Sequence, residues 1–435
     1  MAPILVNISL SITFMLRSIN LVFFIVLLIS CSNRPNSSNS ISISMHEKLN
    51  TISQNHDLLG MSAVLIKNGD PFFSHYYGYG KADSSLVIDE NTQFRIASIS
   101  KTFSTLAIIK LWEQGKLDLD KDVSSYLGWE LRNPNFPDKP ISTRLLISHL
   151  SSIRDGEAYG KFVGDMMEKE LDIRELFTLN GSYFTSDMFS DSLAPATYFS
   201  YSNSAFGLVA TLVEKISGER FDIFTQKNLF SPMGMNASFN VMSSDLPNLA
   251  TLYRTKDGKW NPQADDYQSS KPEERAYPNY QIGRNGLLYG PQGSLRISTK
   301  DLITLSKLFF NDLPKDKQVI SKATIDTMLS YKWDYSNENG IENGATWDGF
   351  WFSYGMGLHH VSGKKGDQLL GSLPLFGHPG IAYGLLSDFY INRDNKIGLI
   401  FITNGSKNAF KEADNSGFYQ VEMDVANALN TLLDK

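Results

Sequence analysis

The chain of 435 residues contains a single cysteine, Cys31, so no disulfide can form within it. Basic residues are not gathered in a block, and the formal net charge is −6, which argues against a nucleic-acid partner. The uninterrupted apolar run at residues 21–29 is too short to span a bilayer comfortably. There is no internal repeat, and 42% hydrophobic with 20% charged residues is the composition of an ordinary globular protein.

The N-terminal segment has the layout of an export signal. Arg17 precedes the apolar run, so we expect residues 1–30 to be a signal peptide. Leu28-Ile29-Ser30-Cys31 resembles the bacterial lipobox, which implies acylation of Cys31 and a lipid anchor. Residues 31–42 are polar and low in complexity, and we expect them to form a flexible tether. The alternative is a signal-anchor helix that merely contains a cysteine.

A short polar sequence opens a strongly apolar helical stretch at Ser98. Ser98 and Lys101 are three residues apart, a spacing that places both side chains on one face of a helix. A serine hydroxyl is a poor nucleophile unless an adjacent group takes its proton, and apolar neighbours favour the neutral, proton-accepting form of a lysine. At a helix start, backbone N–H groups and the helix dipole point at a developing oxyanion. We therefore predict that Ser98 is a nucleophile and Lys101 its base.

This spacing alone is a weak signal. About two Ser-x-x-Lys matches are expected by chance in a chain of this length. Ser362-Gly363-Lys364-Lys365 is a rival, but it lies in a Gly/Lys turn with no helix to hold the geometry. An ordinary helix start, with a serine cap and a surface lysine, fits Ser98 and Lys101 about as well. Further catalytic residues elsewhere in the chain are needed to distinguish a catalytic pair from an ordinary helix start.

Hydrophobic periodicity predicts the other helices and strands. Helices are expected at 41–56, 98–115, 141–150, 203–217, 299–310, 322–329 and 417–433. Strands are expected at 61–67, 72–78, 352–360, 381–392 and 396–404, and residues 255–285 are expected to be irregular. Strands at both ends with helices between them predict one antiparallel sheet built from the two termini, carrying a helical insertion.

A serine–lysine hydrolase needs a further proton-transfer group, and Tyr-x-Asn supplies a phenol with an amide for substrate recognition. The chain contains four such matches. Tyr201-Ser202-Asn203 is the one that immediately precedes an amphipathic helix, whereas the matches at 277–279, 335–337 and 390–392 lie in loops or a strand. In isolation, a tyrosine beside an asparagine helix cap explains the motif equally well.

Gly377-His378-Pro379-Gly380-Ile381 lies at the head of a predicted strand. Glycine there permits a substrate to approach the backbone, and the N–H of Ile381 is a candidate second oxyanion donor beside that of Ser98. His378 adds a hydrogen-bonding group that is either charged or neutral. A Gly-Pro turn with an incidental histidine is the commoner meaning of such a stretch.

Taken in order, these three motifs resemble those of the serine beta-lactamase-like family, which includes class C beta-lactamases, D-alanyl-D-alanine carboxypeptidases, D-aminopeptidases and related esterases. The motifs are Ser98-Ile99-Ser100-Lys101, Tyr201-Ser202-Asn203 and His378-Pro379-Gly380. The likeness covers most of residues 45–430. It implies an α+β, beta-lactamase/transpeptidase-like fold, with a catalytic domain at 43–435 and a helical insertion at about 116–295.

The resemblance also implies a chemistry. Ser98, Lys101 and Tyr201 would be catalytic in a serine hydrolase that forms an acyl-enzyme without metal or cofactor. The substrate-binding residues implied are Asn203, His378, Gly380 and Ile381. The acyl donor would be an ester or amide: a small acyl ester, a D-amino-acid amide or a cell-wall peptide.

Three departures from the family pattern bear on the substrate. Leu150-Ser151-Ser152 stands where relatives commonly have Thr-Ser-Gly, and Pro195-Ala196 stands for Pro-Gly. The third motif is His-Pro-Gly at residues 378–380, whereas beta-lactamases and carboxypeptidases of the family usually carry Lys-Thr-Gly, which helps to hold the substrate carboxylate. A true beta-lactamase or D-Ala-D-Ala carboxypeptidase is therefore the alternative activity. Pro379 also removes one backbone donor from the strand.

Two hypotheses that assign the protein a non-enzymatic function stay open. The chain could be a catalytically silent lipoprotein that binds peptidoglycan fragments, or a surface adhesion lipoprotein with a borrowed fold. In each case we expect it in the bacterial cell envelope, periplasmic or surface-facing, anchored to the membrane through Cys31. A small-molecule or peptide substrate is the other expected partner, and the oligomeric state is left open.

Overall fold

The computed structural model describes residues 37–433 except 167, 268–279, 337–338, 340–349 and 415. The chain divides into two compact units, residues 1–48 and 49–435. The predicted signal peptide, with Cys31, lies outside the described residues. Helix α2 (Ser37–Asn55) begins at Ser37, so the last residues of the predicted tether are helical. In the described part of the chain, no helix has the length and apolar character needed to cross a membrane.

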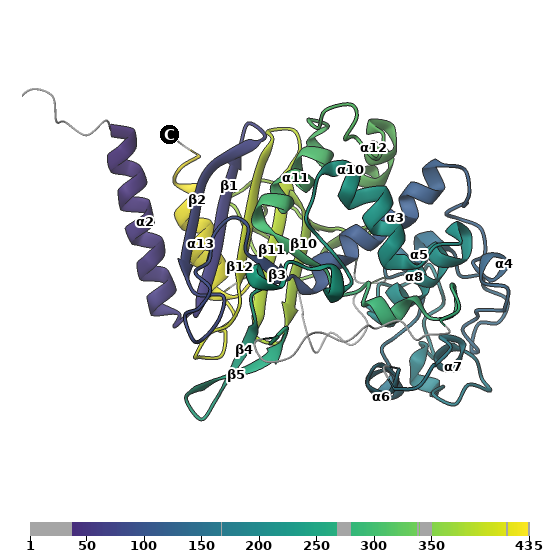
Figure 1. Cartoon of the computed structure of the whole chain (residues 1–435). Coiled ribbons are helices and arrows are strands. Elements are labelled where there is room, and N and C mark those ends of the chain that lie inside the picture. The colour runs from purple at the N-terminus through teal and green to yellow at the C-terminus, as the bar shows by residue number, and fades with distance from the viewer. Residues whose placement is uncertain are drawn as a thin grey trace, which may run out of the picture. The chain divides into compact units, whose positions relative to one another are not determined.

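The second unit is built on a large antiparallel sheet (Figure 1). Over the described residues it has eight strands in the order β2-β1-β12-β11-β10-β9-β8-β7. Their bounds are β1 Gly60–Lys67, β2 Asp70–Gly78, β7 Lys332–Asp334, β8 Ser353–Gly355, β9 His359–Val361, β10 Leu375–Ala382, β11 Leu385–Asn392 and β12 Ile397–Thr403. β1 pairs with β12 from Met61↔Thr403 to Ile66↔Gly398, which confirms a sheet built from both ends of the chain.

Helices cover both faces of this sheet, with α13 on one face and α11 on the other (Figure 1). The central strands β11 and β12 are accordingly buried along almost their whole length, as expected for strands that face helices on two sides. The helices are α3 Ser100–Glu113, α4 Ser124–Leu127, α5 Thr143–Ile147, α6 Glu157–Asp165, α7 Arg174–Phe177, α8 Ser204–Ser217, α9 Phe221–Thr225, α10 Ser231–Met233, α11 Thr299–Phe310, α12 Lys322–Ser330 and α13 Gln420–Asn430. The α+β class is therefore confirmed.

Three expectations about the strands were wrong. Residues 255–285 were expected to be irregular, but β4 (Leu252–Lys256) and β5 (Lys259–Ala264) form a hairpin. Its turn is Asp257-Gly258, where both residues have positive φ, the conformation that such a two-residue turn requires. The single strand expected at 352–360 is two strands, β8 and β9, separated at Gly357, which also has positive φ.

The third error concerns the strand expected at 381–392. It is a hairpin of β10 and β11 around Tyr383-Gly384, with φ values of 57° and 93°. A tyrosine in the left-handed region is uncommon, so the turn was not visible in the sequence pattern. As a consequence, His378 and Gly380 lie within β10 and not at the head of a strand.

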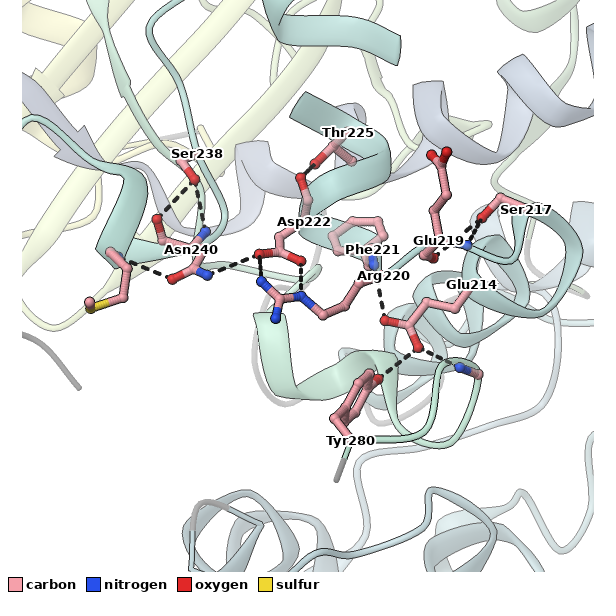
Figure 2. A network of polar contacts seen from close by, with 12 residues as sticks. Glu214, Ser217, Glu219, Arg220, Phe221, Asp222, Thr225, Ser238, Asn240 and Tyr280 are labelled. Carbon is pink, nitrogen blue, oxygen red and sulfur yellow. Dashed lines mark hydrogen bonds and ion pairs between the residues drawn. The ribbon is translucent and has the colours of Figure 1, made fainter. Parts of the chain in front are cut away.

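A buried polar network around Glu214 joins α8 to the start of α9 and to the segment at residues 280–283 (Figure 2). The Glu214 carboxylate is fully buried and accepts hydrogen bonds from Phe221 N (3.0 Å), Gly283 N (2.7 Å) and the Tyr280 hydroxyl (2.7 Å). Burial raises the pKa of Glu214. These bonds satisfy an otherwise costly buried group and fix the C-terminal half of α8, whose N-terminus follows the Tyr-Ser-Asn motif.

Candidate active site

The Ser98 segment begins with a short strand, β3 (Gln93–Arg95), continues through a 3-10 turn, Ala97–Ile99, and enters α3 at Ser100. The predicted helix start is therefore confirmed, with Ser98 in the 3-10 turn that precedes the α-helix. Ala97 has a φ of 48°, a strained conformation for a residue with a Cβ. Ala97 and Ile99 are buried, whereas Ser98 is partly exposed. The turn thus presents Ser98 to solvent from an otherwise buried segment.

Lys101 is fully buried, and its amine contacts three oxygen atoms. Nζ lies 3.1 Å from Ser98 Oγ, 2.7 Å from Asn203 Oδ1 and 3.0 Å from the carbonyl oxygen of Gln292. Burial lowers the pKa of Lys101 to about 7, because a low-dielectric environment disfavours the ammonium. A neutral amine that donates its two N–H bonds to Asn203 and Gln292 directs its lone pair toward the Ser98 hydroxyl.

Tyr201 and Asn203 lie immediately before α8, and both contact the Lys101 amine. The Asn203 side chain does not cap the helix, so the capping explanation of the motif does not hold. Lys101 Nζ lies 4.8 Å from the centre of the Tyr201 ring. Burial raises the pKa of Tyr201 well above its usual value, and the neighbouring Ser98 hydroxyl opposes this effect to a smaller extent. The phenol therefore carries its proton at neutral pH.

β10 passes directly beside the Ser98 turn. A Cβ on Gly380 would lie 2.4 Å from the Ile96 carbonyl oxygen and 3.3 Å from Ala97 Cβ, so only glycine permits this approach. Ser387 Oγ on the neighbouring strand donates to the same Ile96 carbonyl at 3.1 Å. Ile381, the next residue of β10, is thereby placed beside the nucleophile turn.

His378 is fully buried, in a cluster of aromatic rings that includes Tyr201 and Trp351. Nδ1 donates to the Pro379 carbonyl oxygen at 2.6 Å, so Nε2 accepts from the Tyr354 hydroxyl at 3.1 Å. Burial lowers the pKa of His378 well below its usual range, which keeps the imidazole neutral. Both ring nitrogens are occupied, so any influence of His378 on a substrate acts through its neighbours.

The structure adds residues that sequence reasoning missed. Asp155 accepts a hydrogen bond from Asn203 Nδ2 at 2.8 Å, and His149 Nδ1 accepts one from Ser202 N at 3.1 Å. His149 lies near the end of the helix expected at 141–150. Gln292 contacts the Lys101 amine through its backbone carbonyl. Every residue type has this group, so the sequence could not indicate the contact.

The rival motifs have other partners. Ser362 lies in a turn after β9, where its N–H donates to Asp367 Oδ2 at 2.7 Å. The Tyr390 hydroxyl donates to His359 Nδ1 at 2.7 Å. The match at 277–279 and Asn337 lie outside the described residues. Across the described ranges, no cluster of three or more His, Cys, Asp or Glu is arranged to hold a metal ion.

Comparison with known proteins identifies relatives of the chain. A sequence profile of the Beta-lactamase family matches residues 46–420. Penicillin-binding protein 4* of Bacillus subtilis (strain 168) is 26% identical over 356 residues, which cover 81% of this chain and 70% of that protein.

Two solved structures show the same fold. The octameric penicillin-binding protein homologue from Pyrococcus abyssi superimposes with a TM-score of 0.65 at 24% identity, covering 92% of this chain and 78% of that one. A class C beta-lactamase superimposes with a TM-score of 0.64 at 17% identity, covering 92% and 98%. The fold is thus beta-lactamase/transpeptidase-like, and the chain belongs to the beta-lactamase family.

Proposed function

We propose that the protein is a serine hydrolase that forms an acyl-enzyme with a small ester or amide. The observation that carries this proposal is the buried Lys101 amine at 3.1 Å from Ser98 Oγ. A base with a pKa near the working pH is the most effective proton acceptor, and burial brings that of Lys101 to about 7.

In the proposed mechanism, Ser98 attacks the carbonyl carbon while Lys101 takes the hydroxyl proton. The tetrahedral intermediate then collapses, and the proton on Lys101 passes through the Tyr201 hydroxyl to the leaving group, which restores the neutral amine. The backbone N–H groups of Ser98 and Ile381 stabilise the oxyanion. Water then hydrolyses the acyl-enzyme, and Asn203 lies beside the bound substrate.

A wild-type experiment tests the proposal. The protein is incubated with a labelled acyl-phosphonate, and the adduct is located by intact-mass and peptide mass spectrometry. We expect one adduct, on the peptide that contains Ser98. No adduct would favour a silent peptidoglycan-binding lipoprotein or an adhesion lipoprotein, and an adduct at Ser362 would overturn the assignment of the nucleophile.

The third motif, residues 378–380, bears on which substrate charge the site prefers. The neutral His378 and Pro379 replace a cation and a hydroxyl that relatives use for a carboxylate. Arg296, which otherwise could restore a cation, is buried in an ion pair with Asp265 at 2.6 Å, and Arg284 donates to the Glu170 backbone. A carboxylate-bearing substrate thus forfeits about one to two powers of ten in affinity per lost charged contact.

We therefore expect higher kcat/KM for uncharged short acyl esters or amides than for nitrocefin or a D-Ala-D-Ala peptide. Parallel kinetics on a p-nitrophenyl ester and on nitrocefin measure the ratio. Clearly faster nitrocefin hydrolysis would contradict the argument and favour a true beta-lactamase.

We also propose that Cys31 is acylated and anchors the protein in the bacterial cell envelope. The support is the lipobox-like sequence at residues 28–31. Cys31→Ser is expected to leave the domain folded and to release it from membranes, as measured by fractionation. Retention of this variant after a high-salt wash would favour an uncleaved anchor.

A further inference from the structure

The loop between α5 and α6 carries an aspartate, Asp155, that contacts residues 202–204 at the start of α8. Asp155 accepts four hydrogen bonds there. The donors are Ser204 N at 2.7 Å and Ser202 Oγ at 3.1 Å on Oδ1, and Asn203 Nδ2 at 2.8 Å and Asn203 N at 2.9 Å on Oδ2. No other carboxylate among the described residues bonds to Asn203.

A carboxylate has about four lone-pair sites, and these four donors occupy them. Asp155 is exposed, and its acceptor sites are taken up by donors of the α8 start. Its role toward the site is therefore the orientation of the groups that it binds.

The group that matters is the Asn203 amide. Because Asp155 holds Nδ2, the amide presents Oδ1 to Lys101 Nζ at 2.7 Å. A rotated amide would point an N–H donor at the amine, which would lose the acceptor that fixes its lone pair toward Ser98. We propose that Asp155 is a positioning residue of the hydrolase proposed above, because its carboxylate fixes the Asn203 amide with its oxygen toward the Lys101 amine.

Charge adds a second, measurable consequence. Among the described residues, the charged and titratable groups that interact with Lys101 include Asp155, Tyr201, His149 and His378. Burial lowers the pKa of both histidines well below their usual range, and the Tyr201 phenol keeps its proton. Burial also lowers the pKa of Lys101, and the Asp155 charge opposes this effect. Removal of the Asp155 charge therefore moves the pKa of Lys101 further down.

The test measures the second-order rate of labelling by the acyl-phosphonate against pH, which reports acylation without a known substrate. Asp155→Asn is expected to lower the plateau rate by about ten- to a hundredfold, the scale of one charge-assisted hydrogen bond. The rise of the rate with pH should move to lower pH. Asp155→Ser, which also removes the charge and the acceptor of Asn203 Nδ2, should show the same two changes.

Asp89→Asn is the matched control. The Asp89 carboxylate is also exposed and accepts two backbone N–H bonds and a hydroxyl, from Asn91 and Thr92, but it has no contact with Asn203 or Lys101. Its rate and pH profile should equal those of the wild type. A double-mutant cycle with Asn203→Ala should be strongly non-additive, because Asp155 acts through Asn203.

The outcomes separate this inference from the proposed function. No labelling of the wild-type protein refutes the hydrolase. If the wild type is labelled but Asp155→Asn keeps the wild-type pH profile, only the positioning role is refuted. Additive effects in the double-mutant cycle would refute it in the same way. If neither Asp155 variant folds, the role of Asp155 is to stabilise the start of α8, and the inference is equally overturned.

Discussion

Lys101→Ala is expected to reduce acylation by about a hundred- to ten-thousandfold, the usual contribution of a positioned general base. The amine is the group within 3.1 Å of Ser98 Oγ that can accept its proton. In the wild type, the rate should rise with pH through about 7, since burial lowers the pKa of Lys101 to that value and the protonated amine accepts no proton. This rise should be absent in Lys101→Ala.

The measurement is pre-steady-state acylation, with circular dichroism to confirm folding. Tyr201→Phe should lose most acylation as well, and Ser98→Ala sets the floor. Ser362→Ala, in the rival motif, should match the wild type. Near-wild-type turnover of Lys101→Ala or Tyr201→Phe would mean that the proton-transfer groups are wrongly assigned.

Arg296→Met is expected to destabilise the domain by about 3–5 kcal/mol, the usual cost of removing one partner of a buried ion pair. Arg296 and Asp265 have 0% and 1% of their side chains exposed, and the guanidinium donates to both carboxylate oxygens at 3.0 and 2.6 Å. Arg296 lies on β6 (Arg296–Ser298), which pairs with β3 beside the Ser98 turn. The substitution leaves a buried carboxylate without its counter-charge.

Urea unfolding measures this loss. The double variant Arg296→Met/Asp265→Leu should recover much of it, because both charges are then removed. The exposed pair Lys300–Glu90, with side chains 59% and 57% exposed at 3.9 Å, gives a control, and Lys300→Ala should leave the midpoint unchanged. A midpoint in Arg296→Met close to that of the wild type would show that solvent reaches the pair.

The sequence predicted those parts of the molecule that local patterns determine. The hairpin of β1 and β2, helix α8 closed by Gly218, and helix α11 were each expected within a few residues of their observed bounds. The Ser98–Lys101 pair also follows from local geometry, because a spacing of three residues on a helical turn brings the side chains together whatever surrounds them.

What the sequence did not show depends on contacts between distant segments. Asp155 approaches Asn203 because the loop before α6 passes the start of α8, a tertiary arrangement without a local pattern. The Gln292 contact uses a backbone carbonyl, which every residue type has. The Tyr383 turn was missed because a bulky residue there adopts positive φ, against its propensity.

The position of β1 between β2 and β12 has a consequence for the order in which the chain can fold during synthesis. β1 and β2 leave the ribosome together, but β12 follows only near the end of translation, so one edge of β1 remains without a partner until then. An unpaired strand edge invites wrong pairing, and long-range pairing is intrinsically slow. The sheet therefore cannot be completed before residues 397–403 have been synthesised.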